Sequence, residues 1–199
     1  MNSGRVFLLR HGETEWSRTG RHTSHTDVPL TERGRELAKA AGQLLRDLRG
    51  DDPPALVLTS PRRRARDTAE LAGLRVDGVD ERLAEWDYGE SEGRTTPEIR
   101  ESVPGWTVWT HPSVGGETAE EVAARADALL ADVRAKLGDG DGDVVLVGHG
   151  HFSRVLVARW IGLPATAGVH FAMDAAAVSV LGDERDVPRI DHLNLQARI

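Results

Sequence analysis

Residues 6–13 read VFLLRHGE, a short apolar run that ends in an arginine and a histidine. The apolar part, Val6–Leu9, has counterparts bounded by polar residues, glycine or proline at Ala55–Thr59, Asp143–Gly148 and Ala177–Leu181. Short continuous apolar runs are typical of strands that are buried on both faces of a parallel sheet. A weaker alternation over Arg189–Gln196 predicts one more strand, at an edge of the sheet.

Helical patterns separate these runs. The expected helices span Thr31 to about Arg49, Ser60 to about Leu71 with Ser60 as N-cap and Pro61 as the first helical residue, Thr118 to about Leu137, and His151 to about Ile161. Strands that alternate with helices indicate the α/β class. We therefore expect a single domain over residues 1–199, with a mainly parallel sheet flanked by helices on both faces.

Composition excludes several classes of function. The net charge of −7 argues against a general nucleic-acid binder, so any positive charge for a phosphate group must be local. No apolar run approaches the roughly 20 residues that cross a bilayer, and the lack of cysteine excludes disulfides and thiolate metal sites. We expect a cytoplasmic protein with a small molecule as its partner, and neither a nucleic acid nor a membrane; a homodimer stays open.

The carboxyl ends of the predicted strands carry the reactive side chains. Ligands of open α/β sheets bind beyond these ends. The first strand leads into Arg10 and His11, the second into Ser60 and then the arginine cluster that includes Arg64, and the third into His149. Arginines and helix N-termini bind phosphate groups. Two histidines there suit phosphoryl transfer, in which one attacks phosphorus and the other donates to a phosphoryl oxygen.

Phosphate ester hydrolysis also needs an acid that protonates the leaving oxygen and then deprotonates water. Glu85 is the carboxylate best placed for this, although four other acids lie nearby: Glu81, Asp87, Glu90 and Glu92. A zinc site built from His22, His149 and His151 is disfavoured because the phosphatase chemistry already uses His149. Arginines supply charge stabilisation without a metal, so we expect neither a metal nor another cofactor.

Residues 9–16, LRHGETEW, resemble the signature of the histidine phosphatase superfamily, which includes the cofactor-dependent phosphoglycerate mutases. Blocks within residues 29–34, 60–69 and 147–150 agree with that family in order and spacing. The resemblance implies a phosphoglycerate mutase-like fold. It implies the following roles: His11 as the phosphorylated nucleophile, Arg10, Arg64 and His149 as the phosphate cradle, Glu85 as general acid and base, and Ser17, Thr23 and Gly150 as substrate-binding residues. We add His151 to the substrate-binding set, either as a residue of the pocket wall or as one that orients a neighbouring site residue.

The family contains several activities, and the segments around Glu85 and His149 help to choose among them. A mutase is disfavoured because the interval between these two residues is short and its arginines are scattered. Residues 85–99 and 149–152 look like a branch that includes bacterial broad-specificity acid phosphatases and fungal sedoheptulose-1,7-bisphosphatases.

A sugar bisphosphatase needs a second cationic site, which the sequence does not reveal. We therefore favour a metal-independent phosphomonoesterase that acts through a phosphohistidine. A catalytically inactive phosphate-binding module is disfavoured, because binding alone needs no acid and base such as Glu85.

Residues 86–116 show little regular periodicity. Long segments of this kind often cover a site. We expect an excursion that covers the active site and stands outside the scaffold. Its two tryptophans, Trp106 and Trp109, are expected to serve in packing.

Overall fold

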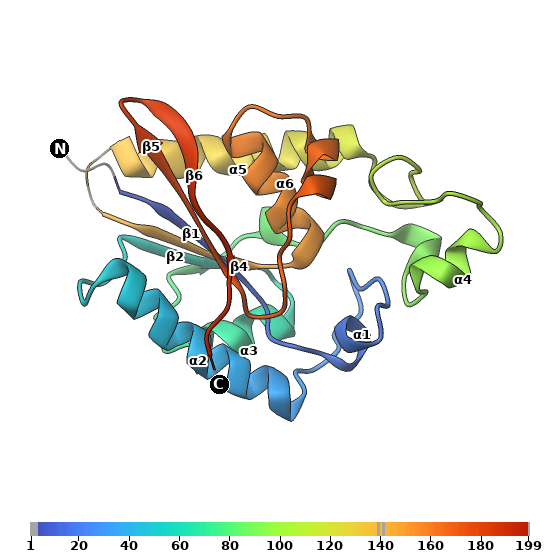
Figure 1. Cartoon of the computed structure of the whole chain (residues 1–199), viewed down its shortest axis with the longest axis horizontal. Helices are drawn as coiled ribbons and strands as arrows, with labels where there is room; N and C mark the ends of the chain where they lie inside the picture. Colours follow the sequence, from blue (N-terminus) through green and yellow to red (C-terminus); the bar gives the residue numbers. More distant parts are fainter. Residues whose placement is uncertain (1–3, 139, 141, 199) are drawn as a thin grey trace.

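The computed structural model describes residues 4–138, 140 and 142–198. Its centre is a six-stranded sheet in the order β3-β2-β4-β1-β5-β6 (Figure 1). The strands are Val6–Arg10 (β1), Leu56–Thr59 (β2), Gly78–Val79 (β3), Val144–Gly148 (β4), Val178–Glu184 (β5) and Val187–Leu195 (β6). β1 to β4 run parallel, whereas β5 is antiparallel to β1 and to β6. The predicted α/β class and mainly parallel sheet are confirmed.

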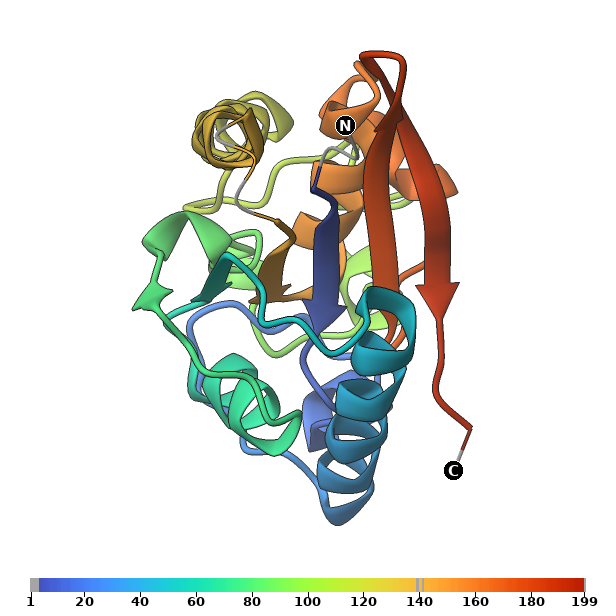
Figure 2. The ribbon, with the colours of Figure 1, turned by 90° about the vertical axis from the view of Figure 1, so that its left-hand side faces the viewer.

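Helices cover both faces of this sheet. They are Glu15–Arg18 (α1), Glu32–Arg49 (α2), Arg63–Leu71 (α3), Thr96–Arg100 (α4), Ala119–Gly138 (α5) and Gly150–Trp160 (α6), with 3-10 helices at Glu81–Leu83 (η1), Gly89–Ser91 (η2) and Ala165–His170 (η3). Figures 1 and 2 show α2 and α3 on one side of the sheet and α5 and α6 on the other. No helix within the described ranges is both long and apolar enough to cross a membrane.

The central strand β1 shows why both faces need a cover. Phe7 and Leu9 join the apolar cluster that includes side chains of α2 and α3, whereas Val6 and Leu8 join the cluster of α5 and α6. All four are fully buried. Successive side chains of a strand point to opposite faces, so a strand that is apolar at every position must lie between two layers of helices.

One helix begins later than its sequence predicts. Ser60 and Pro61 were expected as N-cap and first residue, but α3 begins at Arg63, and Arg62 is its N-cap without a side-chain capping bond. The hydroxyl of Ser60 lies instead 2.6 Å from the ring of His149. The same hydroxyl accepts the amide of Arg62 at 3.3 Å, so Ser60 contacts both the chain just before α3 and the distant His149.

The excursion formed by residues 86–116 is better ordered than its sequence predicts. It contains η2 and α4, and α4 begins with a reciprocal capping box between Thr95 and Glu98. Trp106 and Trp109 are buried in the same cluster as α5 and α6, which confirms their packing role. The expectation that this segment stands outside the scaffold is wrong, because its apolar side chains extend the main core.

Candidate active site

The sheet topology brings the reactive side chains together. β1 and β2 both lie beside β4 and run parallel to it, so their carboxyl ends meet at one edge. His11, Ser60 and His149 directly follow these ends, and the ring centroids of His11 and His149 lie 5.3 Å apart.

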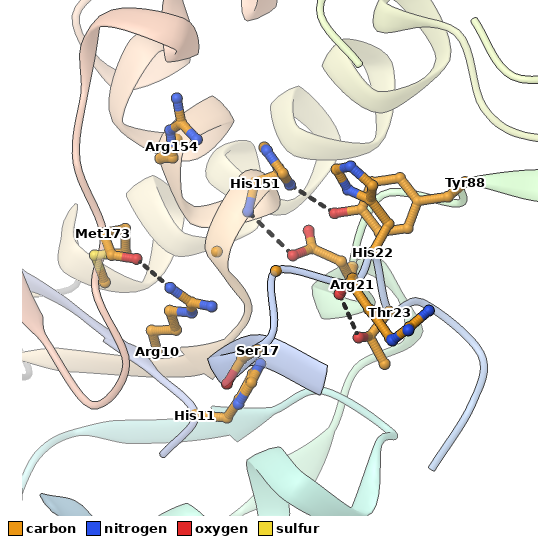
Figure 3. A pocket seen from close by; sticks show the side chains of 13 residues that line it. Arg10, His11, Ser17, Arg21, His22, Thr23, Tyr88, His151, Arg154 and Met173 are labelled. Carbon is orange, nitrogen blue, oxygen red and sulfur yellow. Dashed lines mark hydrogen bonds between the residues drawn. The ribbon is translucent and has the colours of Figure 1, made fainter. Parts of the chain in front are cut away.

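A cavity of about 160 Å³ opens at this edge (Figure 3). The predicted site residues that line it are Arg10, His11, Ser17, Thr23, Glu85, Gly150 and His151. The remaining two, Arg64 and His149, are fully buried and lie outside this lining. All nine therefore gather at or directly behind one cavity.

The hydrogen bond of His11 decides which of its nitrogens carries a proton. Nδ1 lies 2.7 Å from the carbonyl oxygen of Gly12, which can only accept. The neutral ring must therefore be protonated on Nδ1, and Nε2 keeps its lone pair. Burial, followed by the positive charges of Arg64 and Arg10, holds the pKa of His11 well below its usual value. The ring is thus neutral, with an unprotonated Nε2, in an electropositive site.

His149 has a complementary arrangement. Its Nε2 lies 2.6 Å from Ser60 Oγ, while its Nδ1 is buried without a protein hydrogen-bond partner. Burial and then the charge of Arg64 lower the pKa of His149 well below its usual value. When the Ser60 hydroxyl donates to Nε2, the ring proton lies on Nδ1, where it can serve as a donor.

The guanidinium groups of Arg10 and Arg64 are held by carbonyl oxygens. Arg10 Nη1 donates to Met173 O at 2.7 Å, and Arg64 donates to the carbonyls of Thr26, Thr23 and Ser24 at 2.9 to 3.2 Å. Burial lowers the pKa of both arginines. Their Nε atoms are buried without a protein partner. Hydrogen bonds to neutral carbonyl oxygens hold the two guanidinium groups in place and leave their positive charge available to an anion.

Glycine at position 150 lets the backbone approach one of these cations. A Cβ atom there would lie only 3.2 Å from Cζ of Arg10. The start of α6 therefore packs closely against the guanidinium, and a larger residue would push it away.

Glu85 is fixed at the amino end of α6. Its Oε1 accepts hydrogen bonds from the amides of Trp86 at 2.9 Å and Phe152 at 2.8 Å, and its Oε2 accepts from the amide of His151 at 3.0 Å. The side chain is only 7% exposed, yet it lines the cavity. The free amides of a helix N-terminus stabilise a carboxylate and orient it.

The hydroxyl groups of Ser17 and Thr23 face the cavity but already have backbone partners. Ser17 Oγ accepts the amide of Thr14 at 2.9 Å in the α1 capping box and donates to Thr14 O at 3.1 Å. Thr23 Oγ1 donates to Arg21 O at 3.0 Å. The capping role and a position at the cavity thus coexist in Ser17.

Comparison with known proteins places this geometry in a family. The profile of the Histidine phosphatase superfamily (branch 1) matches residues 6–196. The chain belongs to this family. It is 51% identical over 191 residues to an acid phosphatase of Mycobacterium tuberculosis, covering 96% of this chain and 92% of that protein. It is 33% identical to a sedoheptulose 1,7-bisphosphatase of Saccharomyces cerevisiae, covering 80% of this chain and 68% of that protein.

Solved structures agree with this assignment. A Mycobacterium tuberculosis open reading frame superposes on this histidine phosphatase with a TM-score of 0.93 at 50% identity, covering 98% of this chain and 99% of the other. A mycobacterial glucosyl-3-phosphoglycerate phosphatase in complex with VO3 gives 0.83 at 33% identity, covering 97% and 100%. The matches confirm the resemblance, the phosphoglycerate mutase-like fold and the phosphatase class predicted from the sequence.

Several residues of the histidine phosphatase site were missed by sequence reasoning. They are Arg21, Tyr88, Arg154 and Met173. Two others were noticed but given another role: Ser60 as a helix N-cap and His22 as a zinc ligand. Arg154 had a usable signal, because it lies three residues after His151 and thus on the same face of α6. Tyr88 had none, since only the fold brings its hydroxyl to 2.6 Å from His151 Nδ1 (Figure 3).

The histidines considered for a zinc site do not gather as ligands. His22 and His151 stack at 5.8 Å between ring centroids, and His151 Nδ1 is bonded to Tyr88. In the described part of the chain, no group of three His, Cys, Asp or Glu side chains is arranged to hold a metal ion.

Proposed function

We propose that this histidine phosphatase hydrolyses small phosphate monoesters through a phosphorylated His11 and without a metal. The observation that carries the proposal is the bond from His11 Nδ1 to Gly12 O, because it leaves an unprotonated Nε2 close to the charges of Arg64 and Arg10. A nitrogen lone pair facing bound phosphorus is the requirement for in-line attack.

The first step transfers the phosphoryl group. The P–Nε2 bond to His11 forms as the ester P–O bond breaks, and Glu85 gives a proton to the leaving oxygen. In the second step Glu85 takes a proton from water, whose oxygen displaces Nε2 and releases inorganic phosphate. Arg10, Arg64 and the Nδ1–H of His149 stabilise the charge on the phosphoryl oxygens in both steps.

Buried donors without protein partners support these roles. They are the Nε atoms of Arg10 and Arg64 and the Nδ1 atom of His149. A buried polar group left unpaired costs about 1–3 kcal/mol. A phosphoryl group with several strong acceptor oxygens would pair all three.

Hydrolysis of a chromogenic aryl phosphate in the presence of EDTA tests the proposal. The wild-type protein is expected to turn over, and His11→Ala is expected to abolish turnover while the exposed His170→Ala leaves it unchanged. Lack of turnover by the folded wild-type protein, or full activity of His11→Ala, would refute the proposal.

A bisphosphatase is the second candidate, favoured by Arg154. This guanidinium lines the cavity, donates to Gly168 O at 2.9 Å and Val169 O at 3.2 Å, and lies 4.7 Å from the ring of Trp109. Its hydrogen bonds are to carbonyl oxygens, so its charge is a candidate for the second cationic site that a bisphosphatase needs.

A panel of sugar monophosphates and bisphosphates separates the two candidates. If the protein is a bisphosphatase, Arg154→Gln should raise KM about tenfold for bisphosphates only. Arg134→Gln serves as the matched control, because Arg134 also donates to a carbonyl oxygen and lies over a tryptophan ring, that of Trp160, but does not line the cavity. Equal effects of Arg154→Gln on both substrate groups would favour the general monoesterase.

We also propose that residues 86–116 cover the active site. The partner is a small-molecule phosphate ester, and the protein acts in the cytoplasm. Tyr88 in this segment lines the cavity, and the Arg94 carbonyl accepts the amide of His22. These contacts support a segment that shapes the substrate side of the site.

A further inference from the structure

Residues 173–177 lie against the end of β1 and touch Arg10 directly. Arg10 Nη1 donates to Met173 O at 2.7 Å, and the amide of Arg10 donates to Ala177 O at 3.1 Å (Figure 3 shows the first bond). The amide of Ala176 donates to His11 O at 3.1 Å. The position of this segment therefore sets the position of the guanidinium that faces the cavity.

The opposite side of the segment meets an irregularity in β6. The pairing of β5 with β6 loses register opposite Ser179, where β6 carries one extra residue. Asn194 lies at this bulge with φ +55°, a left-handed conformation that asparagine tolerates better than most residues. Its amide donates to Ser179 Oγ at 3.0 Å. Bulges next to active sites commonly re-aim a side chain.

The side chain of Asn194 forms hydrogen bonds with Asp174, the residue after Met173. Asn194 Oδ1 accepts from the amide of Asp174 at 2.6 Å, and Asn194 Nδ2 donates to Asp174 Oδ2 at 2.9 Å. Ser179 Oγ, which accepts the Asn194 amide, also donates to Met173 Sδ at 3.3 Å. The bulge thus holds both Met173 and Asp174.

We propose that Asn194 is a positioning residue for the phosphate site, because it fixes residues 173–174 and thereby aims the guanidinium of Arg10. The inference rests on the proposed function in one respect, namely that Arg10 binds the phosphoryl group. Asn194 itself does not line the cavity. Its effect must therefore disappear when Arg10 is absent, whereas a general effect on folding would persist.

A double-mutant cycle measures this dependence. Orthovanadate is the probe, and its dissociation constant is measured by calorimetry for the wild type, Asn194→Gly, Arg10→Ala and the double variant. Glycine keeps the left-handed backbone without strain and removes only the side-chain bonds. Asp186→Gly, at φ +66° in the β5–β6 turn, is the matched control.

Asn194→Gly is expected to weaken vanadate binding about tenfold when Arg10 is present, less than the roughly 100-fold that a 1 Å misplacement can cause in rate. It should change binding less than about twofold when Arg10 is alanine. Asp186→Gly should leave vanadate binding unchanged whether Arg10 is present or is alanine. Equal weakening in both backgrounds, or no weakening by Asn194→Gly in the wild type, would overturn the inference.

A second variant keeps the test decisive if Asn194→Gly does not fold. Asn194→Asp retains the acceptor for the Asp174 amide and replaces the Nδ2 donor with an oxygen that repels Asp174 Oδ2, so it should show the same dependence on Arg10. Vanadate binding with this coupling but without ester hydrolysis would refute the proposed function and leave the positioning role standing. No vanadate binding by the wild-type protein would overturn both.

Discussion

His22 makes part of the stability of the protein depend on pH, and His22→Phe should remove that part. The ring lies 4.8 Å from Tyr88 and 5.0 Å from Trp106 between centroids, beneath the excursion of residues 86–116. Burial lowers the pKa of His22 from 6.5 to about 4. Phenylalanine keeps a ring in this aromatic cluster but cannot take up a proton.

Proton linkage gives the direction in which stability changes with pH. Between pH 6.5 and about 4 the unfolded chain binds a proton at His22 that the folded chain does not, so acidification favours unfolding. The stabilising contribution is complete above pH 6.5 and is lost progressively down to about pH 4. These two pKa values correspond to a loss of roughly 2 kcal/mol between pH 7 and pH 5.

Urea unfolding at pH 7 and pH 5 measures this difference. Burial also lowers the pKa values of His11, His149 and His151, so the wild type should lose more than the contribution of His22 alone. His22→Phe should lose roughly 2 kcal/mol less than the wild type over this interval, and the exposed His170→Phe should behave as the wild type. Parallel losses in wild type and His22→Phe would refute the assigned pKa.

Two further predictions concern the active site. Ser60→Ala leaves His149 Nε2 buried without its 2.6 Å partner, so the free energy of unfolding should fall by about 1–3 kcal/mol and kcat/KM should fall with it; denaturation and steady-state assays at pH 7 would contradict this by showing no change. Glu85→Gln should lower kcat/KM, which reports the first step, about 100-fold or more for alkyl phosphates but less than tenfold for nitrophenyl phosphate, because only poor leaving groups need a proton in that step; equal lowering of both would assign the acid to another residue.

The scaffold was predictable because its strands are buried on both faces and therefore read as uninterrupted apolar runs. β1 and β4 are the clearest cases, and their ends located His11 and His149. β3 was missed because it has only two residues, which is too short for any periodicity.

The sequence predictions that failed concern features that depend on contacts between distant segments. Ser60 followed by proline has the local pattern of a helix start, yet its hydroxyl is used by His149, 89 residues away. The burial of Trp106 in the main core depends on how the excursion folds back on α5 and α6, which local pattern does not encode. The bulge at Asn194 is likewise a product of strand pairing, because register is set between strands and not within one.

Detection of a phosphorylated His11 during turnover tests the central claim most directly. Enzyme mixed with excess aryl phosphate, quenched within milliseconds at alkaline pH and digested, is analysed by mass spectrometry. The phosphoryl group is predicted on Nε2 of His11, because Nδ1 is bonded to Gly12 O, and Glu85→Gln should increase its amount when water attack becomes limiting. Turnover of the ester without phosphate on His11, or with phosphate on His149, would contradict the account.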